Sequence, residues 1–156
     1  MQRRVWCETL SLAEASAPAT ISLLRRYQLG VLLAVRPWQL AEWPAAVARL
    51  QDAGVTVGAW PMLADDAGRW ASVASMPAFV ALVDAVLAAC PAVDELAIDL
   101  EPPIATMAAW QAGRPVRPPG TGAGFGAAHA ALAAGISRWR AAGVRRVCSA
   151  VMPMLV

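Results

Sequence analysis

Two carboxylates separated by a single residue, Asp99 and Glu101, form the most chemically capable pair in this sequence. They lie at the end of a short apolar run that reads as a strand, so both side chains point to one face, with Cα atoms about 7 Å apart. Two confined carboxylates repel each other when both are ionised, so one keeps its proton to higher pH. An acid still protonated near neutral pH can protonate the leaving oxygen in glycoside cleavage. The alternative is that the pair only caps the strand end or pairs with Arg36.

Three further side chains fall at the ends of neighbouring predicted strands. Glu8 belongs to the end of the first strand, Arg36 follows the second, and Trp60 ends the third. Glu8 could be a second acid, a hydrogen-bond acceptor for a substrate, or a partner for Arg36, and we favour the pairing. We expect all three side chains to border the space occupied by the carboxylate pair.

Seven tryptophans stand out against one tyrosine and two phenylalanines. Trp38, Trp70 and Trp110 fall in predicted strand-to-helix loops, where aromatic faces could stack on the apolar faces of sugar rings. Each could equally anchor a loop or belong to the core. Trp6 and Trp139 are assigned to packing.

The elements that would position these residues alternate along the chain. Short runs rich in β-branched residues are separated by longer helical patterns, which is typical of βαβ units and a parallel sheet. A proline follows most of these runs and marks where strand pairing ends, because proline cannot donate to a sheet. The five predicted strands are 5–10, 29–35, 55–60, 96–100 and 147–152.

Four helices are predicted between the strands. Pro18, Pro44 and Pro77 suit the first turn of the first three, where a missing N–H group costs nothing. Apolar residues at helical spacing over 125–139 indicate the fourth. The segment 102–123 is the longest predicted loop, and loops of that length are usually functional or disordered.

Side-chain alternation within the strands favours a barrel. In the fourth strand Ala97, Asp99 and Glu101 share one face, whereas an open sheet covered on both sides would need both faces apolar. A barrel places small and polar residues inside, toward the carboxyl ends of its strands. The predicted fold is therefore the first five parallel strands and four helices of a (β/α)8 TIM-like barrel, in one domain over 1–156. An open, flavodoxin-like parallel sheet is the alternative.

A closed barrel of this kind has eight strands, so five strands imply an incomplete one. The two open sheet edges could mediate self-association or pair with a missing C-terminal half. A non-catalytic or truncated barrel with a binding or interaction role is the functional alternative to an enzyme.

The fourth strand resembles the chitinase-type TIM-barrel glycoside hydrolases, whose signature there is Asp-Gly-x-Asp-x-Asp-x-Glu. This sequence has aspartates at Asp94 and Asp99 and a glutamate at Glu101 in matching places. Glu95 replaces the glycine, and Ala97 replaces an aspartate. The resemblance implies a glycan substrate, Glu101 as general acid, and Asp99 as the carboxylate that orients the substrate's acetamido group for attack. It covers eight residues and the order of the βα units.

Composition excludes several other classes of protein. Of 156 residues, 58% are hydrophobic and 15% charged, which excludes a disordered chain. The net charge is +2 and the arginines are scattered, so no nucleic-acid partner is predicted. His129 is the only histidine and the three cysteines are far apart, so we predict no metal and no cofactor.

The remaining expectations concern membranes and location. The amino terminus is charged and lacks the apolar segment of a signal peptide, so a cytoplasmic protein is expected. Two weakly charged stretches, 76–93 and 119–137, are interpreted as buried helices and not as membrane spans, because prolines bracket the first and small residues dominate the second.

Overall fold

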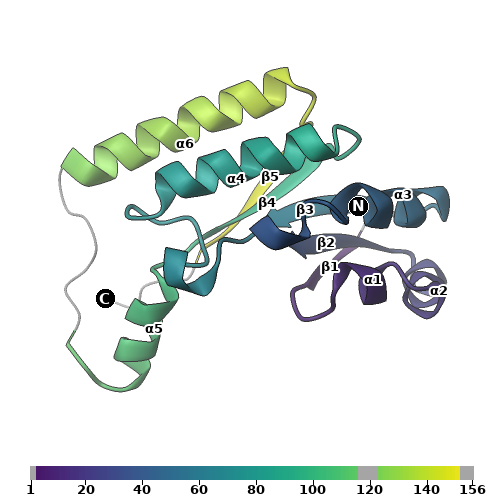
Figure 1. The fold of residues 1–156 in the computed structure, drawn as a ribbon, viewed down its shortest axis with the longest axis horizontal. Coiled ribbons are helices and arrows are strands. Elements are labelled where there is room, and N and C mark those ends of the chain that lie inside the picture. Colours follow the sequence, from purple (N-terminus) through teal and green to yellow (C-terminus); the bar gives the residue numbers. More distant parts are fainter. Residues whose placement is uncertain (1–2, 116–122, 152–156) are drawn as a thin grey trace.

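A computed structural model of the chain describes residues 3–115 and 123–151, in which strands and helices alternate (Figure 1). The strands are β1 (Arg3–Cys7), β2 (Leu29–Val35), β3 (Val57–Pro61), β4 (Glu95–Leu100) and β5 (Arg146–Val151). The helices are α1 (Leu12–Ala15), α2 (Pro18–Arg26), α3 (Trp43–Asp52), α4 (Met76–Ala89), α5 (Ile104–Gln111) and α6 (Ala123–Ala141). Two single turns of 3-10 helix, η1 (Pro37–Gln39) and η2 (Asp65–Ala67), follow β2 and β3.

The five strands form one parallel sheet in the order β1-β2-β3-β4-β5. Strand order therefore follows chain order, as in a (β/α) barrel, and differs from the 2-1-3-4-5 order of a flavodoxin-like sheet. The sheet curls into a half-barrel, and β1 and β5 are its two edges. The prediction of a parallel α/β fold with partial-barrel form is confirmed.

Helices α1, α2, α3, α4 and α6 pack on the outer face of this sheet, where the main core lies, whereas α5 buries none of its residues. Strand residues of one parity, such as Leu33, Val57 and Ile98, pack there against Trp43, from α3, and Phe79, from α4. Figure 1 shows α4 and α6 side by side on this side of the sheet. The side chain of Trp139, from α6, is buried in the same core. No helix within residues 3–115 and 123–151 is long and apolar enough to span a membrane.

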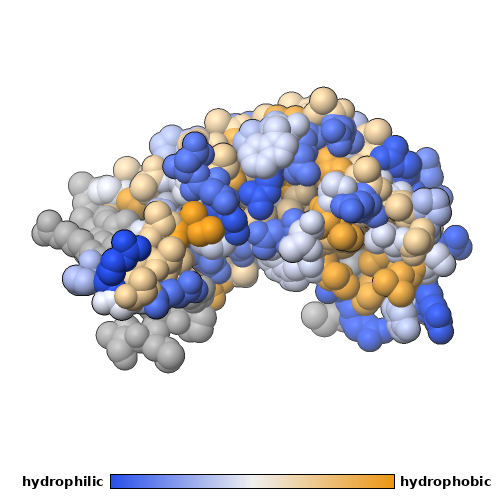
Figure 2. Space-filling model, turned by 60° about the horizontal axis from the view of Figure 1, so that its bottom comes forward, coloured by the Kyte–Doolittle hydropathy of each residue, from blue (hydrophilic) through white to orange (hydrophobic). Residues whose placement is uncertain are grey.

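The inner face, opposite the helices, carries side chains of the other parity. A second, smaller cluster of buried side chains lies on it, formed by Leu32, Ala34, Trp60, Met62 and Ala97. Figure 2 shows the molecule hollowed beneath its middle, between two lobes, with hydrophilic residues gathered around the hollow.

At the amino ends of the strands, the inner face is closed by a layer of ion pairs. The carboxylate of Glu95 accepts from Arg4 at 2.8 Å and from Arg146 at 3.3 Å, and Glu95 is buried. Two glycines make room for this layer: a Cβ on Gly30 would lie 2.9 Å from the Arg4 guanidinium, and one on Gly58 would lie 3.0 Å from Glu95 Cγ. Polar contacts at this end of a barrel serve stability more than catalysis.

Several predicted boundaries are corrected. The first strand was predicted over 5–10, but β1 ends at Cys7 and Glu8 lies in the loop after it. The third strand was predicted over 55–60 but occupies Val57–Pro61, with its proline as the last residue. The last predicted strand residue, Met152, lies outside the described residues.

The described residues contain six helices in place of the four predicted. The additional α1 is a single turn that begins with a capping box, in which the hydroxyl of Ser11 accepts from the N–H of Glu14 and the Glu14 carboxylate accepts from the N–H of Ser11. The additional α5 lies inside the segment predicted as a long loop, of which 116–122 fall outside the described residues. A predicted loop residue, Trp110, is therefore helical.

Candidate active site

Asp99 lies near the carboxyl end of β4, on the inner face, with only 7% of its surface exposed. It sits directly beyond Ala97 of the inner cluster and opposite Ala150 in the register of β5. The small neighbours leave space on this face, so a carboxylate can lie within it without reaching into bulk solvent. Strand parity places Asp99 here, as predicted.

Asp99 is held by a tryptophan from the neighbouring strand. The indole Nε1 of Trp60, at the end of β3, donates a hydrogen bond of 3.1 Å to Oδ2 of Asp99. The ring of Trp6, from β1, contacts Trp60 edge-on, with centroids 4.8 Å apart and planes at 88°. Trp6 is 41% exposed and lies opposite Leu32 of the inner cluster in the β1–β2 register, so it belongs to the same face of the sheet as Asp99.

The surroundings of Asp99 raise its pKa from 3.8 to about 6. Burial is the largest cause, followed by the nearby negative charge of Glu101; the Trp60 hydrogen bond opposes both, and Glu8 adds a smaller upward effect. The pKa of Glu101 is raised too, by burial first and then by Glu8. Burial therefore contributes more to both raised pKa values than repulsion between the carboxylates does.

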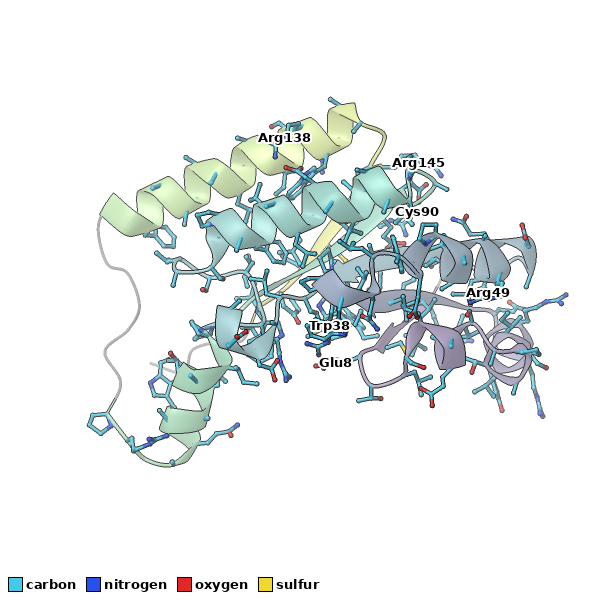
Figure 3. The ribbon with its side chains drawn as sticks, in the orientation of Figure 1. Glu8, Trp38, Arg49, Cys90, Arg138 and Arg145 are labelled. Carbon is cyan, nitrogen blue, oxygen red and sulfur yellow. The ribbon has the colours of Figure 1, made fainter. Side chains whose placement is uncertain are left out.

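Glu8 forms the centre of an ion-pair cluster at the same end of the sheet. Its Oε1 lies 3.6 Å from the guanidinium of Arg36 and 3.2 Å from that of Arg69, so the predicted pairing with Arg36 is confirmed. Asp65 holds Arg69 with two hydrogen bonds of 2.8 and 2.9 Å. Figure 3 shows Glu8 and Trp38 toward this end of the sheet, with Arg145 at the opposite end.

Arg69 was missed by the sequence analysis. It comes from the loop between β3 and α4, after η2, where Gly68 and Arg69 both adopt positive φ angles of 102° and 62°. Left-handed backbone at two successive residues turns the chain sharply and returns the Arg69 side chain to Asp65 and Glu8. The sequence signal available for this turn is Asp65 and Asp66 followed by Gly68, a composition typical of turns.

The loop tryptophans lie at three different places. Trp38 is 63% exposed and lies under the Arg36 guanidinium, with 5.7 Å from the guanidinium carbon to the ring centroid. Trp70 lies under Arg69 in the same way at 5.4 Å and packs against the inner cluster. Trp110 lies apart from both, in a pocket on the helix side of β4.

Glu101 connects these regions. It follows the last residue of β4, is half-buried, and its charge acts on Asp99, on the inner face. It also lines the pocket that contains Trp110. No hydrogen bond or ion pair joins its carboxylate to any residue in 3–115 or 123–151.

The structure thus brings Asp99, Glu101, Glu8, Arg36 and Trp60 together, with Trp38 and Trp70 at the border of the group and Trp110 beyond Glu101. Buried acids of raised pKa beside arginines and indoles can exchange protons with a bound polar molecule and hydrogen-bond its hydroxyl groups. Within the described residues, no group of three or more His, Cys, Asp or Glu side chains could hold a metal ion. Comparisons with protein-family models, curated proteins and solved structures found no match to this chain.

Proposed function

We propose that the inner-face carboxylates form the acid–base site of a glycoside-hydrolase-like barrel, with Glu101 as general acid and Asp99 as the orienting carboxylate. The observation that carries the proposal is a pair of neighbouring carboxyl groups that both have raised pKa values: Glu101, raised by burial and by Glu8, and Asp99, which accepts a hydrogen bond from Trp60 and has a pKa near 6. Glycoside cleavage needs one carboxyl group that is still protonated near neutral pH and a second group that can stabilise positive charge or orient the attacking group.

The two carboxyl groups suit different roles because their environments differ. Asp99 is buried and fixed by Trp60, which suits a group that must hold a fixed orientation. Glu101 is more accessible, and its carboxyl group forms no hydrogen bond or ion pair with another described residue, so it can meet a leaving oxygen. A nearby cation would lower the pKa of Glu101 by stabilising its ionised form. The two arginines of the site are instead paired with Glu8 and Asp65, so neither forms an ion pair with Glu101.

The aromatic side chains support a sugar as the ligand. Trp6, Trp60 and Trp70 lie around the inner face, and Trp38 is exposed beside Arg36. Sugar rings combine apolar C–H faces, which stack on indoles, with hydroxyl groups, which pair with carboxylates and guanidinium groups. Both kinds of partner are present within one region.

The chitinase-type resemblance supports the same assignment with one difference. That family's signature has an aspartate where this chain has Ala97, which is fully buried in the inner cluster. A carboxyl group at this place could share a proton with Asp99 from within the same strand. Here the indole of Trp60 provides the polar contact to Asp99, from the neighbouring strand.

Hydrolysis of N-acetylglucosamine oligomers and other glycans, followed by reducing-end release, tests the proposal. We expect Glu101→Gln to lower kcat/KM by at least about 100-fold, the usual contribution of a general acid. Asp52→Asn is the matched control, because Asp52 is an exposed carboxylate at the end of α3. Turnover that is unchanged in Glu101→Gln would end the proposal.

Glycan binding without turnover favours the second candidate, a non-catalytic barrel that binds sugar. Ala97 and the open inner face are the observations in its favour. In that case the affinity for a glycan should fall in Trp60→Ala and be nearly unchanged in Glu101→Gln. Calorimetric titration of the same oligomers separates the two candidates.

A further inference from the structure

A pocket of about 350 Å³ lies on the helix side of the sheet, at the carboxyl end of β4. Its walls come from the loop before α4, from the starts of α4 and α6, and from the end of α5. Its volume falls at the lower end of the range for sites that hold small molecules. It does not include the ion-pair cluster around Glu8.

Most of the pocket wall is apolar. Val73, Met76, Leu100 and Leu132 line it, and Ala128 forms a small, buried part of the α6 wall. An apolar group that entered would leave water for a hydrocarbon surface, which favours binding.

Two aromatic rings border the same space. Trp110, at the end of α5, lines it, and Phe125, on α6, does so although 60% of its surface is exposed. Phe125 begins the apolar spacing over 125–139 but does not belong to the buried face of α6. Phe125 also stacks on His129, with ring centroids 6.4 Å apart, and the His129 ring lines the pocket as well.

One acidic side chain lies at the edge of this apolar space. Glu101 lines the pocket, and among the described residues it has no hydrogen-bond or ion-pair partner. The nearest acidic neighbours, Glu8 and Asp99, add negative charge, while Arg36 and Arg69 are engaged elsewhere in the site. The pocket therefore offers a carboxylate and the faces of aromatic rings, which both attract a cation.

We propose that this pocket binds a small organic cation, with its ammonium group at Glu101 and its apolar or aromatic body against Met76, Leu100, Trp110 and Leu132. An inorganic cation would gain nothing from the apolar walls, and a neutral hydrocarbon would leave the carboxylate unpaired. The inference goes beyond glycoside hydrolysis and does not depend on it.

Titration of the full chain with 2-phenylethylammonium and with 2-phenylethanol at pH 8 tests the proposal. The two probes have the same ring and chain length and differ in charge, and ligand-observed NMR gives both affinities. We expect the ammonium probe to bind about tenfold more tightly, which corresponds to about 1.4 kcal/mol. Equal affinities, or no binding of either probe, would overturn the proposal.

Three variants locate the binding. Glu101→Gln should reduce the affinity of the ammonium probe to that of the alcohol and leave the alcohol unchanged. Ala128→Leu should fill the pocket and weaken both probes, whereas Ala127→Leu, at an exposed position of the same helix, should weaken neither. Circular dichroism confirms that each variant is folded. Identical binding by the Ala128 and Ala127 variants would place the probe elsewhere and refute the assignment.

Discussion

The indole of Trp60 donates to the carboxylate of Asp99 across 3.1 Å, joining the end of β3 to the end of β4 on the inner face of the sheet. This hydrogen bond stabilises the ionised form of a carboxyl group that burial and neighbouring charges would otherwise keep protonated to still higher pH. The balance sets the pKa of Asp99 at about 6. Burial, the charge of Glu101 and this hydrogen bond therefore set the acid–base behaviour of Asp99 together.

Replacing Trp60 by phenylalanine should raise the pKa of Asp99 above its present value, because the donor that lowers it is lost. Phenylalanine also has a smaller ring and no N–H donor, so the free energy of unfolding should fall by about 1–2 kcal/mol. Carbon-detected NMR of the Asp99 carboxyl group and chemical denaturation measure the two effects. Trp38→Phe is the control: Trp38 is mostly exposed, and its replacement should change stability by less than about 0.5 kcal/mol. A lower Asp99 pKa in Trp60→Phe would contradict the account.

Asp99→Asn should stabilise the chain at pH 8 and not at pH 3. The folded-state pKa of Asp99, about 6, lies above its ordinary value of 3.8, so the folded chain binds the extra proton between these values. The contribution of Asp99 to stability is therefore complete below about pH 4 and is lost as the pH rises to about 6.

The loss amounts to roughly 2–3 kcal/mol, from the difference between the two pKa values. Asparagine keeps an oxygen that can accept from Trp60 but cannot ionise. Urea denaturation of both proteins from pH 3 to pH 8 should give curves that separate as the pH rises. Parallel curves would show that Asp99 titrates normally.

Gly58→Ala should destabilise the ion-pair layer at the amino end of the sheet. Its Cβ would lie 2.6 Å from a methyl carbon of Leu32 and 3.0 Å from Cγ of Glu95, which holds Arg4. Because the Leu32 methyl is the end of a flexible side chain, we expect a loss of about 1–3 kcal/mol in the free energy of unfolding.

Gly126→Ala provides the matched comparison in the same assay. A Cβ on Gly126 would meet nothing within 4 Å, and this residue is helical. Alanine is the better helix former, so this variant should gain about 0.5–1 kcal/mol. Equal effects of the two substitutions would show that Glu95 does not pack over Gly58.

The order of the strands and the parity of their side chains could be predicted from the sequence, because both depend on local patterns. Alternation in β4 placed Asp99 on the inner face, and the end of β3 placed Trp60 beside it. The ion pair between Glu8 and Arg36 could be predicted because both residues follow parallel strands, whose carboxyl ends lie at the same edge of the sheet. These contacts required no knowledge of the loops.

The residues that were missed depend on loop and helix geometry that has no periodic signal. Arg69 reaches Glu8 only because two successive residues adopt positive φ, one of which is not a glycine. α5 consists almost wholly of apolar and small residues, so no amphipathic stripe marked it, and the two prolines before it indicated a loop. The pocket at Glu101 depends on where α5 and α6 lie, and the alternation of side chains along the strands does not predict the positions of these helices.

The central claim is that the negative charge of Glu101 raises the pKa of Asp99 at the carboxyl end of β4. Titration of the Asp99 carboxyl carbon by NMR, in the unaltered chain and in Glu101→Gln, tests it most directly. We expect a midpoint near pH 6 in the unaltered chain and a lower midpoint once the charge of Glu101 is removed. A midpoint near 4 in both proteins would contradict the account.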